Sequence, residues 1–328
     1  MFSKDRCPLC SEPAQCRSEM MTDWYAWRCE RCGCFQARRE VIEDEVMRLP
    51  LEKRMQLASC IREMNTRYGV TPVGLCYSDT DDLPAKRNAY KINQLLTEVF
   101  PRRVQDRFDR ALLNLCAVSQ YPGQEIPWNR AKDFPLVIAE SAEVADFIVR
   151  ELERESYVKA NESFWSMGEA SSYSSTIAVT GPGYRHAAGL VTEQERERSR
   201  RAFVAMWFAE EMNEAWEKGI KPAILECGFE PVRIDEQEFN SDIVDEIIAE
   251  IRRSKFIVAD FTGQRNGVYY EAGFARGLGI PVISTVKTEQ IDSLHFDTQH
   301  NSHVLWADPN ELHRKLLNRI RATISTAI

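Results

Sequence analysis

Residues 256–275 read Phe-Ile-Val-Ala-Asp-Phe-Thr-Gly-Gln-Arg-Asn-Gly-Val-Tyr-Tyr-Glu-Ala-Gly-Phe-Ala, and this stretch decides the fold of the second half of the chain. Its first four residues are apolar without alternation, which is typical of a strand buried on both faces of a parallel sheet. The strand ends at Asp260, a loop with two glycines follows, and the pattern predicts a helix over residues 269–278. A strand, a loop and a helix in this order form the repeating unit of an α/β domain.

The same alternation of apolar runs and amphipathic segments continues on both sides of this stretch. Strands that alternate with helices along one segment predict a doubly wound parallel sheet, and we expect it in flavodoxin-like order over residues 202–328. The apolar runs lie at 203–208, 231–235, 256–259, 281–285 and 302–306.

Ligands of doubly wound sheets bind at the carboxyl ends of the strands. The loop after the third strand has neither the G-x-G-x-x-G pattern of a dinucleotide-binding fold nor the G-x-x-x-x-G-K-[ST] pattern of a phosphate-binding loop. The sequence therefore argues against an ordinary dehydrogenase and against a P-loop ATPase. The candidate substrate-binding residues near these strand ends are Trp207, Phe208, Asp235, Phe261, Gly263, Arg265, Asn266, Gly267, Tyr270 and Asp297.

The segment from Asp260 to Ala275 resembles the nucleoside 2-deoxyribosyltransferase-like family and, more broadly, the TIR-like glycohydrolases of bacterial immunity that share the sheet. The resemblance covers residues 203–325. It implies that Glu271, in its E-x-G-x-A setting, is the nucleophile that attacks the anomeric carbon of a nucleoside. It also implies that Asp260 is the orienting or proton-handling partner, and that Asp297 lines the cleft or completes it in a neighbouring subunit of a homo-oligomer.

The sequence departs from the transferases at one position. Those enzymes place a second aspartate some six residues before the glutamate, where this chain has Arg265 next to Asn266. The departure makes hydrolysis of a nucleotide, or of a dinucleotide such as NAD, at least as well supported as transfer between bases. If Arg265 faces the pocket, its guanidinium favours a phosphorylated substrate over a bare nucleoside.

The two carboxylates also fit this chemistry without the resemblance. Cleavage of an N-glycosidic bond passes through an oxocarbenium-like state that one carboxylate stabilises or bonds to, while a second acid protonates or orients the leaving base. Aromatic residues such as Trp207 and Tyr270 can stack on that base or wall the pocket. The structural alternative is that Glu271 is a favourable charge at a helix N-terminus and that Asp260 caps the end of its strand.

Six of the ten cysteines precede residue 35, and four of them have zinc-ribbon spacing. Two C-x2-C pairs let each turn aim two sulfurs at one ion and complete a tetrahedral S4 site. Such a site has no open position for water, so we expect a structural zinc ion; recognition of nucleic acid or a partner protein is an additional role that stays open. The predicted ligands are Cys7, Cys10, Cys29 and Cys32, with Gly33 suited to the tight turn and Cys16 and Cys34 as spares.

Between the cysteines and the α/β segment, residues 41–118 are expected to be helical. From about residue 105, the order helix, helix, hairpin and closing helix resembles a winged helix-turn-helix. Ser141 is the expected cap of the candidate recognition helix, which carries five acidic and two basic residues between positions 143 and 155. That excess of acid disfavours insertion into a DNA groove. The expected apolar face of the helix is Val144, Phe147, Ile148 and Leu152.

The chain of 328 residues thus divides into four segments. Its formal charge of -8 argues against a phosphate-binding surface over the whole chain, so that any contact with nucleic acid must be local. No signal-peptide pattern and no stretch of 18 uncharged apolar residues occurs, from which we expect a cytoplasmic protein without a membrane partner. The segments are a zinc ribbon (1–40), a helical and winged-helix-like region (41–192), a charged linker (193–201) and the α/β domain (202–328).

Three functions stay open at this point. The first is an N-glycoside hydrolase or transferase, placed in bacterial defence by family analogy alone. The second is a nucleotide-binding sensor that uses the same cleft without turnover, and nothing in the sequence separates it from the first. The third is a nucleic-acid-associated regulator, which the acidic recognition helix disfavours.

Overall fold

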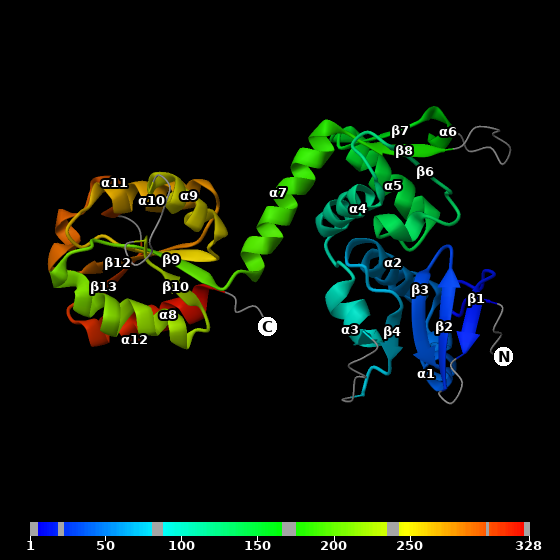
Figure 1. Cartoon of the computed structure of the whole chain (residues 1–328), viewed down its shortest axis with the longest axis horizontal. Helices are drawn as coiled ribbons and strands as arrows, with labels where there is room; N and C mark the ends of the chain where they lie inside the picture. The colour runs from blue at the N-terminus through cyan, green and yellow to red at the C-terminus, as the bar shows by residue number, and fades with distance from the viewer. Residues whose placement is uncertain are drawn as a thin grey trace. The chain divides into compact units, whose positions relative to one another are not determined.

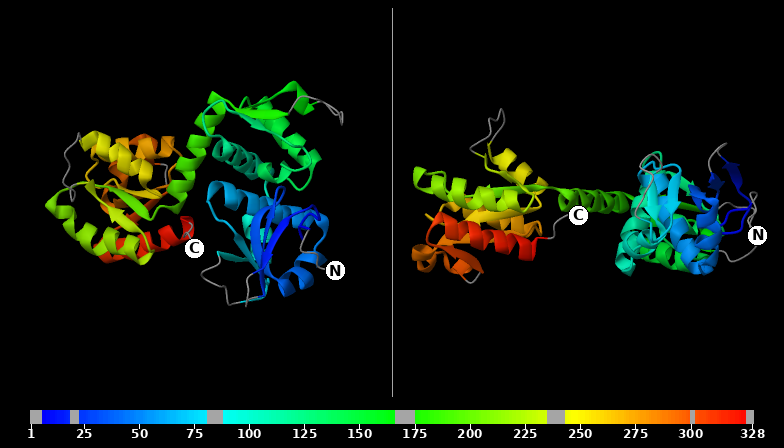
Figure 2. Two further views of the ribbon diagram at one scale, coloured as in Figure 1. Left: turned by 45° about the vertical axis from the view of Figure 1, so that its right-hand side comes forward. Right: turned by 90° about the horizontal axis from the view of Figure 1, so that it is seen from below.

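The computed structural model describes residues 6–18, 23–80, 88–165, 175–234, 243–299 and 302–324. The chain folds into two compact units, Met1–Leu190 and Val191–Ile328, whose elements are labelled in Figure 1 and seen from two further sides in Figure 2. Within the described residues, no helix combines the length and the apolarity that a membrane crossing requires.

The second unit is built on a five-stranded sheet in which every neighbouring pair of strands is parallel, as the apolar runs predict. All five residues of the central strand are buried, because helices cover both of its faces. Numbered along this unit, the strands lie in the order 2-1-3-4-5. The order across the sheet is β10 (Glu230–Val232), β9 (Arg201–Ala205), β11 (Phe256–Asp260), β12 (Val282–Lys287) and β13 (His303–Trp306).

Two layers of helices sandwich this sheet in Figure 1. Trp216 and Leu316 belong to the apolar cluster on one face, and Val268 and Ala272 to the cluster on the other. The first layer contains η6 (Ala215–Ile220), α8 (Lys221–Glu226) and α12 (Pro309–Thr323), and the second contains α9 (Ile243–Arg253) and α10 (Asn266–Gly277). The short helices of this unit are η5 (Glu210–Met212), η8 (Thr288–Ser293) and α11 (Phe296–Gln299).

Two boundaries in this unit differ from the predicted ones and matter for the site. β9 ends at Ala205, so Trp207 and Phe208 lie beyond the strand rather than in it. α10 begins at Asn266, three residues before the predicted start, because the glycine-containing loop is shorter than its composition suggested. Glu271 therefore lies in the second turn of the helix and not in the first.

The first unit contains a mixed five-stranded sheet beside its cysteines. The pairs β1–β2 and β2–β3 are antiparallel, whereas β3–β4 and β4–β5 are parallel. The strands are β1 (Gln15–Ser18), β2 (Trp24–Cys29), β3 (Gly33–Arg38), β4 (Val73–Cys76) and β5 (Ala89–Lys91), and the helices that follow β3 are α1 (Arg39–Asp44), η1 (Val46–Arg48) and α2 (Leu51–Arg67).

The rest of this unit holds a three-stranded sheet in the order β6-β8-β7 together with several helices. Ser141 Oγ accepts a hydrogen bond from Val144 N at 3.4 Å, which confirms the predicted helix cap. The elements are α3 (Ile92–Gln94), η3 (Leu95–Val99), α4 (Val104–Val118), β6 (Glu125–Pro127), η4 (Phe134–Val137), α5 (Ala142–Arg154), β7 (Val158–Ala160), α6 (Glu162–Trp165), β8 (Thr176–Val179) and α7 (Gly181–Arg198), which continues past the unit boundary at Leu190.

One buried apolar cluster runs through the whole first unit. Leu9 and Phe35 from the cysteine-rich segment and Leu57 and Ile61 from α2 belong to the same cluster, which extends as far as Ala187. The cysteine-rich segment therefore shares its core with the helices that follow it. A segment too short to bury a core of its own is stabilised in this way by its neighbours.

Two predictions for this unit were wrong. The pattern over residues 41–118 predicted helices and no strand, but β4 and β5 lie there, because the buried run of β4 pairs with the free edge of β3 and β5 pairs with β4. Phe147 was assigned to the apolar face of α5, yet it is 51% exposed and lies against Phe108 at 6.0 Å, while Val149 is buried in its place.

Candidate functional site

Glu271 is partly withdrawn from water and has no polar partner among the residues that the structure describes. Its side chain is half-buried, and this burial raises its pKa to about 7. Among the described residues, no group hydrogen-bonds to its carboxylate or forms an ion pair with it. The first turn of α10 carries no acidic residue, so a favourable helix-terminus charge does not account for this glutamate. A carboxylate withdrawn from water without compensation is costly, as is typical of groups retained for chemistry.

Asp260 ends β11 in a very different state. Its side chain is fully buried, and burial raises its pKa, although its hydrogen bonds act in the opposite direction. Oδ2 accepts from Thr285 Oγ1 at 2.5 Å and from Trp306 Nε1 at 3.1 Å, and Oδ1 accepts from the backbone N of Thr262 at 3.0 Å. These donors come from β12, from β13 and from the loop after β11. Asp260 thus ties the carboxyl ends of neighbouring strands together.

Three of the predicted substrate-binding residues meet in one contact. Gly263 has a φ of +76°, and a Cβ at this position would lie 2.7 Å from Cε3 of Trp207, so only glycine lets the loop approach the indole. On the same ring, the guanidinium carbon of Arg265 lies 4.1 Å from the centroid, a cation–π distance. The backbone N of Gly263 also donates to Gln290 Oε1 at 2.8 Å, which holds the loop in place.

Two further cations at this edge were not predicted. Arg233 directly follows β10, and its guanidinium carbon lies 4.7 Å from the centroid of Trp216. Lys287 ends β12, and its Nζ lies 5.4 Å from the centroid of Trp306. Because the carboxyl ends of parallel strands meet at one edge, both cations share that edge with Arg265. Arg233 lies within the second apolar run and Lys287 two residues beyond the fourth, so a cation close to the end of a predicted strand is the signal that could have identified them.

Phe261 is a correction to the predicted set. It is fully buried and belongs to the apolar cluster on the α10 face of the sheet. Its ring lies 4.8 Å from that of Tyr269 and 5.7 Å from that of His303. A side chain enclosed in this way packs behind the carboxyl edge and has no exposed surface that could contact a substrate.

The remaining predicted residues lie on the surface or outside the described residues. Asp297 is exposed, and its carboxylate lies 3.4 Å from Nδ1 of His295. The segment of His295 is held to α10, since its backbone N donates to the hydroxyl of Tyr269 at 3.4 Å. Asp235 lies outside the described residues. The exposed members of the predicted set are Phe208, Arg265, Asn266, Gly267, Tyr270 and Asp297.

The four predicted metal ligands come together in the first unit. One sulfur from each lies within 4.8 Å of the other three, and all four residues are buried. The described residues include all ten cysteines and contain no disulfide, so the cluster is not a pair of disulfides. Four thiolates at this spacing suit a tetrahedral ion such as zinc and leave no ligand position open. The residues are Cys7, Cys10, Cys29 and Cys32.

The backbone around the second cysteine pair is held rigidly. Gly33 has a φ of +87°, and a Cβ there would lie 2.3 Å from Oδ1 of Asn65. The same Oδ1 accepts from the backbone N of Cys34 at 2.7 Å, while Nδ2 of Asn65 donates to the carbonyls of Cys34 and Val70 at 3.1 and 2.6 Å. Only glycine fits this close approach of α2 to the turn. Cys34 is thereby fixed outside the cluster.

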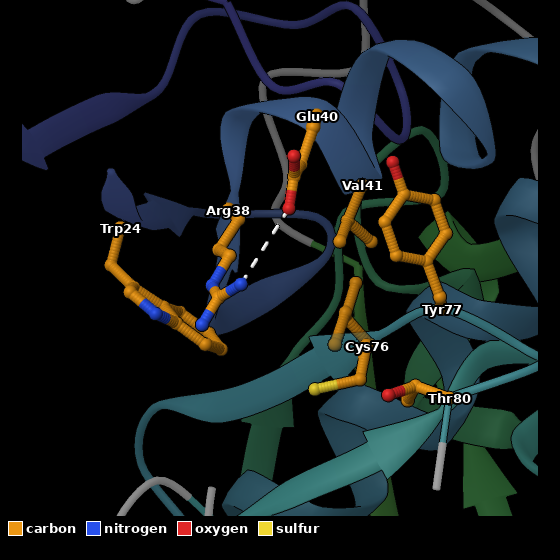
Figure 3. Close-up of a pocket in the computed structure, with 8 residues that line it drawn as sticks. Trp24, Arg38, Glu40, Val41, Cys76, Tyr77 and Thr80 are labelled. Carbon is orange, nitrogen blue, oxygen red and sulfur yellow. Dashed lines mark ion pairs between the residues drawn. The ribbon is translucent and has the colours of Figure 1, made fainter. Parts of the chain in front are cut away.

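A small hollow beside α1 also lies in the first unit (Figure 3). Its volume is about 120 Å³, too little for a nucleoside. Arg38 lies between its two partners in Figure 3: its guanidinium carbon is 6.0 Å from the ring centroid of Trp24, and it forms an ion pair with Glu40 at 3.6 Å. The hollow therefore offers no further candidate for substrate binding.

Comparison of the chain with models of known protein families, with curated proteins and with solved structures gives no match.

Proposed function

We propose that the second unit is an N-glycoside hydrolase or transferase that acts on a nucleotide or an NAD-like dinucleotide, with Glu271 as the nucleophile. The observation that carries this proposal is the half-buried carboxylate of Glu271, which has no partner among the described residues and a pKa of about 7. A cationic ribosyl centre is the kind of partner that such a carboxylate lacks. Its approach would lower the pKa and favour the ionised, nucleophilic form.

The proposed reaction needs no group beyond this carboxylate, the substrate and water. One carboxylate oxygen of Glu271 bonds to the anomeric carbon while the bond from that carbon to the base nitrogen breaks. The electron pair leaves with the base, which takes up a proton unless it departs from a cationic nicotinamide. Water then attacks the same carbon, loses a proton and releases the carboxylate. If a second base attacks in place of water, the result is transfer.

Three cations support a phosphorylated substrate. Arg233, Arg265 and Lys287 each lie over an aromatic ring at the carboxyl edge of the sheet. Stacking on a ring uses the face of a guanidinium group, whereas phosphate oxygens are bound by the N–H donors in its plane. The strand order 2-1-3-4-5 further supports a flavodoxin-like arrangement, in which the ligand lies at this edge.

Asp260 has a positioning role in this proposal. Its oxygens already accept three hydrogen bonds inside the core, so a direct proton transfer to the substrate would break contacts that hold the edge together. By fixing Trp306, it fixes the ring over which Lys287 lies. In this proposal, Asp260 caps the end of its strand, which was the structural alternative, and also keeps the orienting role that the resemblance implies.

We also propose that the four-cysteine cluster holds a structural zinc ion. The neighbouring elements from α4 to α7, with the sheet order β6-β8-β7, support a winged-helix-like arrangement. On its candidate recognition helix, Asp146 accepts hydrogen bonds from Arg130, the shortest at 2.7 Å. The acidic helix is therefore partly neutralised within the unit, which suits packing or a protein partner better than DNA.

A nucleotide-binding sensor is the second candidate. The three stacked cations favour it, because they can hold a phosphate group whether or not Glu271 reacts. If the site binds a nucleotide without turnover, the burial of the Glu271 carboxylate has no chemical explanation.

One experiment separates the two candidates. The purified chain, alone and with candidate triggers, is incubated with NAD and with each ribo- and deoxynucleotide, and free base is followed by chromatography. We expect Glu271→Gln to lower base release about 10³-fold or more, because the nucleophile is removed. Glu289→Gln, at an exposed glutamate of the same unit, is the matched control. Tight nucleotide binding by wild type and both variants, with no base released, would establish the sensor instead.

A further inference from the structure

The first unit carries a groove that the proposed glycosidase does not use. Two hollows, with volumes of about 840 and 340 Å³, share Gln15, Arg28, Cys34 and Thr71 in their linings and therefore lie side by side; together they are called the sheet groove. Gln15 pairs with Arg28 across β1 and β2, and Arg28 with Cys34 across β2 and β3. Residues that pair across strands share a face of the sheet, so one face of three strands lines the groove.

The sheet groove is basic although the whole chain is acidic. Its lining carries five cationic side chains and only two acidic ones. Both acids are engaged: Glu12 pairs with Arg31 at 3.0 Å, and Glu30 pairs with Lys132. The cationic residues are Arg17, Arg28, Arg31, Arg62 and Lys132.

Two of these arginines are available for a ligand. Arg17 and Arg28 are exposed, and neither forms an ion pair with any other part of the chain that the structure describes. Arg17 lies two residues along β1 from Gln15, the partner of Arg28, so the two arginines are diagonal neighbours. Diagonal neighbours on adjacent strands lie on the order of 7–8 Å apart. Two guanidinium groups at that spacing can each hold one phosphate of the same strand.

The groove is formed before a ligand arrives. Asn65 fixes its floor through the hydrogen bonds to Cys34 described above. On one wall, Nε of Arg31 donates to the carbonyl of Ala131 at 2.9 Å. Arg31 lies between the metal ligands Cys29 and Cys32, so the metal centre holds this wall in position. A rigid groove gives up little conformational entropy on binding.

We propose that the sheet groove binds the phosphate backbone of a single-stranded nucleic acid, with Arg17 and Arg28 pairing to phosphates. Four of the five cations are arginines, whose planar forks match phosphate oxygens. The larger hollow alone is near the upper end of small-molecule sites, and the groove continues beyond it, which suits a chain better than one nucleotide. A positively charged groove that follows the backbone is the usual site for single strands. This proposal does not depend on the function of Glu271.

The test measures fluorescence anisotropy of labelled 20-nucleotide oligothymidylate and oligouridylate with the full metal-loaded chain at several salt concentrations. We expect the double substitution Arg17→Gln and Arg28→Gln to weaken binding about 10–100-fold at low salt. The slope of log affinity against log salt should fall by about 0.7 for each phosphate that no longer pairs with an arginine. Arg48→Gln with Arg103→Gln removes two exposed charges of the same unit away from the groove and should change affinity by less than about threefold.

Three results would overturn the proposal. The first is equal affinity of the groove variant and the control variant, both retaining their metal and their melting temperature. The second is tighter binding of a duplex than of either single strand. The third is displacement of the labelled strand by an oligoglutamate as effective as that by unlabelled oligothymidylate, which would assign the groove to an acidic peptide. If the glutamine variant melts early, Arg17→Met with Arg28→Met is compared with the control variant in the same way, because it also removes both charges and keeps part of the side-chain packing.

Discussion

The four-cysteine cluster of the first unit and the carboxyl edge of the second unit both bury ionisable groups, but they satisfy them differently. The four thiols lie within reach of one ion, which would coordinate all of them together. At the carboxyl edge, Asp260 accepts three hydrogen bonds, whereas Glu271 has no partner among the described residues. Groups that are satisfied within the protein hold the fold together. The group left unsatisfied is the one that the proposed function assigns to the substrate.

Loss of the metal should produce the largest effect. Without a shared ion, the four buried thiols keep only their packing, and a structural zinc site contributes on the order of 10 kcal/mol to folding. We expect chelation, or Cys29→Ser, to abolish the melting transition of the first unit and to leave that of the second in place. Calorimetry combined with metal analysis checks this. Cys16→Ser, at a half-buried cysteine outside the cluster, should preserve both transitions. An unchanged first transition after complete metal loss would mean that packing alone holds the thiols.

Substitution of Asp260 should produce the second-largest effect. Asp260→Ala leaves the indole N–H of Trp306, the hydroxyl of Thr285 and one backbone N–H without their acceptor in a dry core. We expect a loss of about 3–5 kcal/mol in the free energy of unfolding of the second unit, measured by urea denaturation. Asp260→Asn keeps one acceptor oxygen and should cost less. If the alanine variant is as stable as wild type, the carboxylate is not a structural centre, and the contrast with Glu271 fails.

Glu271→Gln should raise the free energy of unfolding of the second unit, whereas substitution of Asp260 lowers it. The pKa of Glu271 is raised from an ordinary 4.5 to about 7, so between these pH values the folded chain keeps a proton that the unfolded chain releases. Wild type therefore loses stability as pH rises from about 4.5 to 7 and stays at the lower level above it. A shift of this size corresponds to at most about 3 kcal/mol.

The glutamine variant removes that pH dependence. We expect it to match wild type near pH 4.5 and to be more stable at pH 8, by up to about 3 kcal/mol in urea denaturation at each pH. Glu289→Gln, at an exposed position, should follow wild type at both pH values. Equal stability of Glu271→Gln and wild type at pH 8 would show that Glu271 is not held in an unfavourable site.

The sequence predicted the parts of the molecule that depend on local pattern. Unalternated apolar runs identified the parallel sheet, and the spacing of Cys7, Cys10, Cys29 and Cys32 identified the metal cluster. The surroundings of Asp260 could not be predicted in this way, because its donors Thr285 and Trp306 lie 25 and 46 residues further along the chain. Contacts of that kind depend on strand order, which periodicity does not contain.

The two cations at the carboxyl edge were not predicted for the same physical reason. Arg233 and Lys287 are ordinary surface residues by composition, and only the tertiary fold places the rings of Trp216 and Trp306 beneath them. Glu271 was predicted from its motif, but its environment differs from the expectation. The earlier start of α10 moves it out of the first helical turn, and this removes the structural explanation for the glutamate.

Substitution of Arg265 should give the smallest of these effects, and it tests directly whether the carboxyl edge binds phosphate. Its guanidinium lies on Trp207, so Arg265→Met removes a charge and retains some packing on the ring. We expect KM for a phosphorylated substrate to rise about tenfold relative to the matching nucleoside, with little change in kcat, because the contact acts on binding. Arg265→Lys keeps the charge but not the planar fork and should lie between the two. Arg314→Met, at an exposed position on α12, should leave the preference unchanged. If Arg265→Met has the same preference for phosphate as wild type, the stacked cation only supports Trp207, and the phosphate contact must be sought at Arg233 or Lys287.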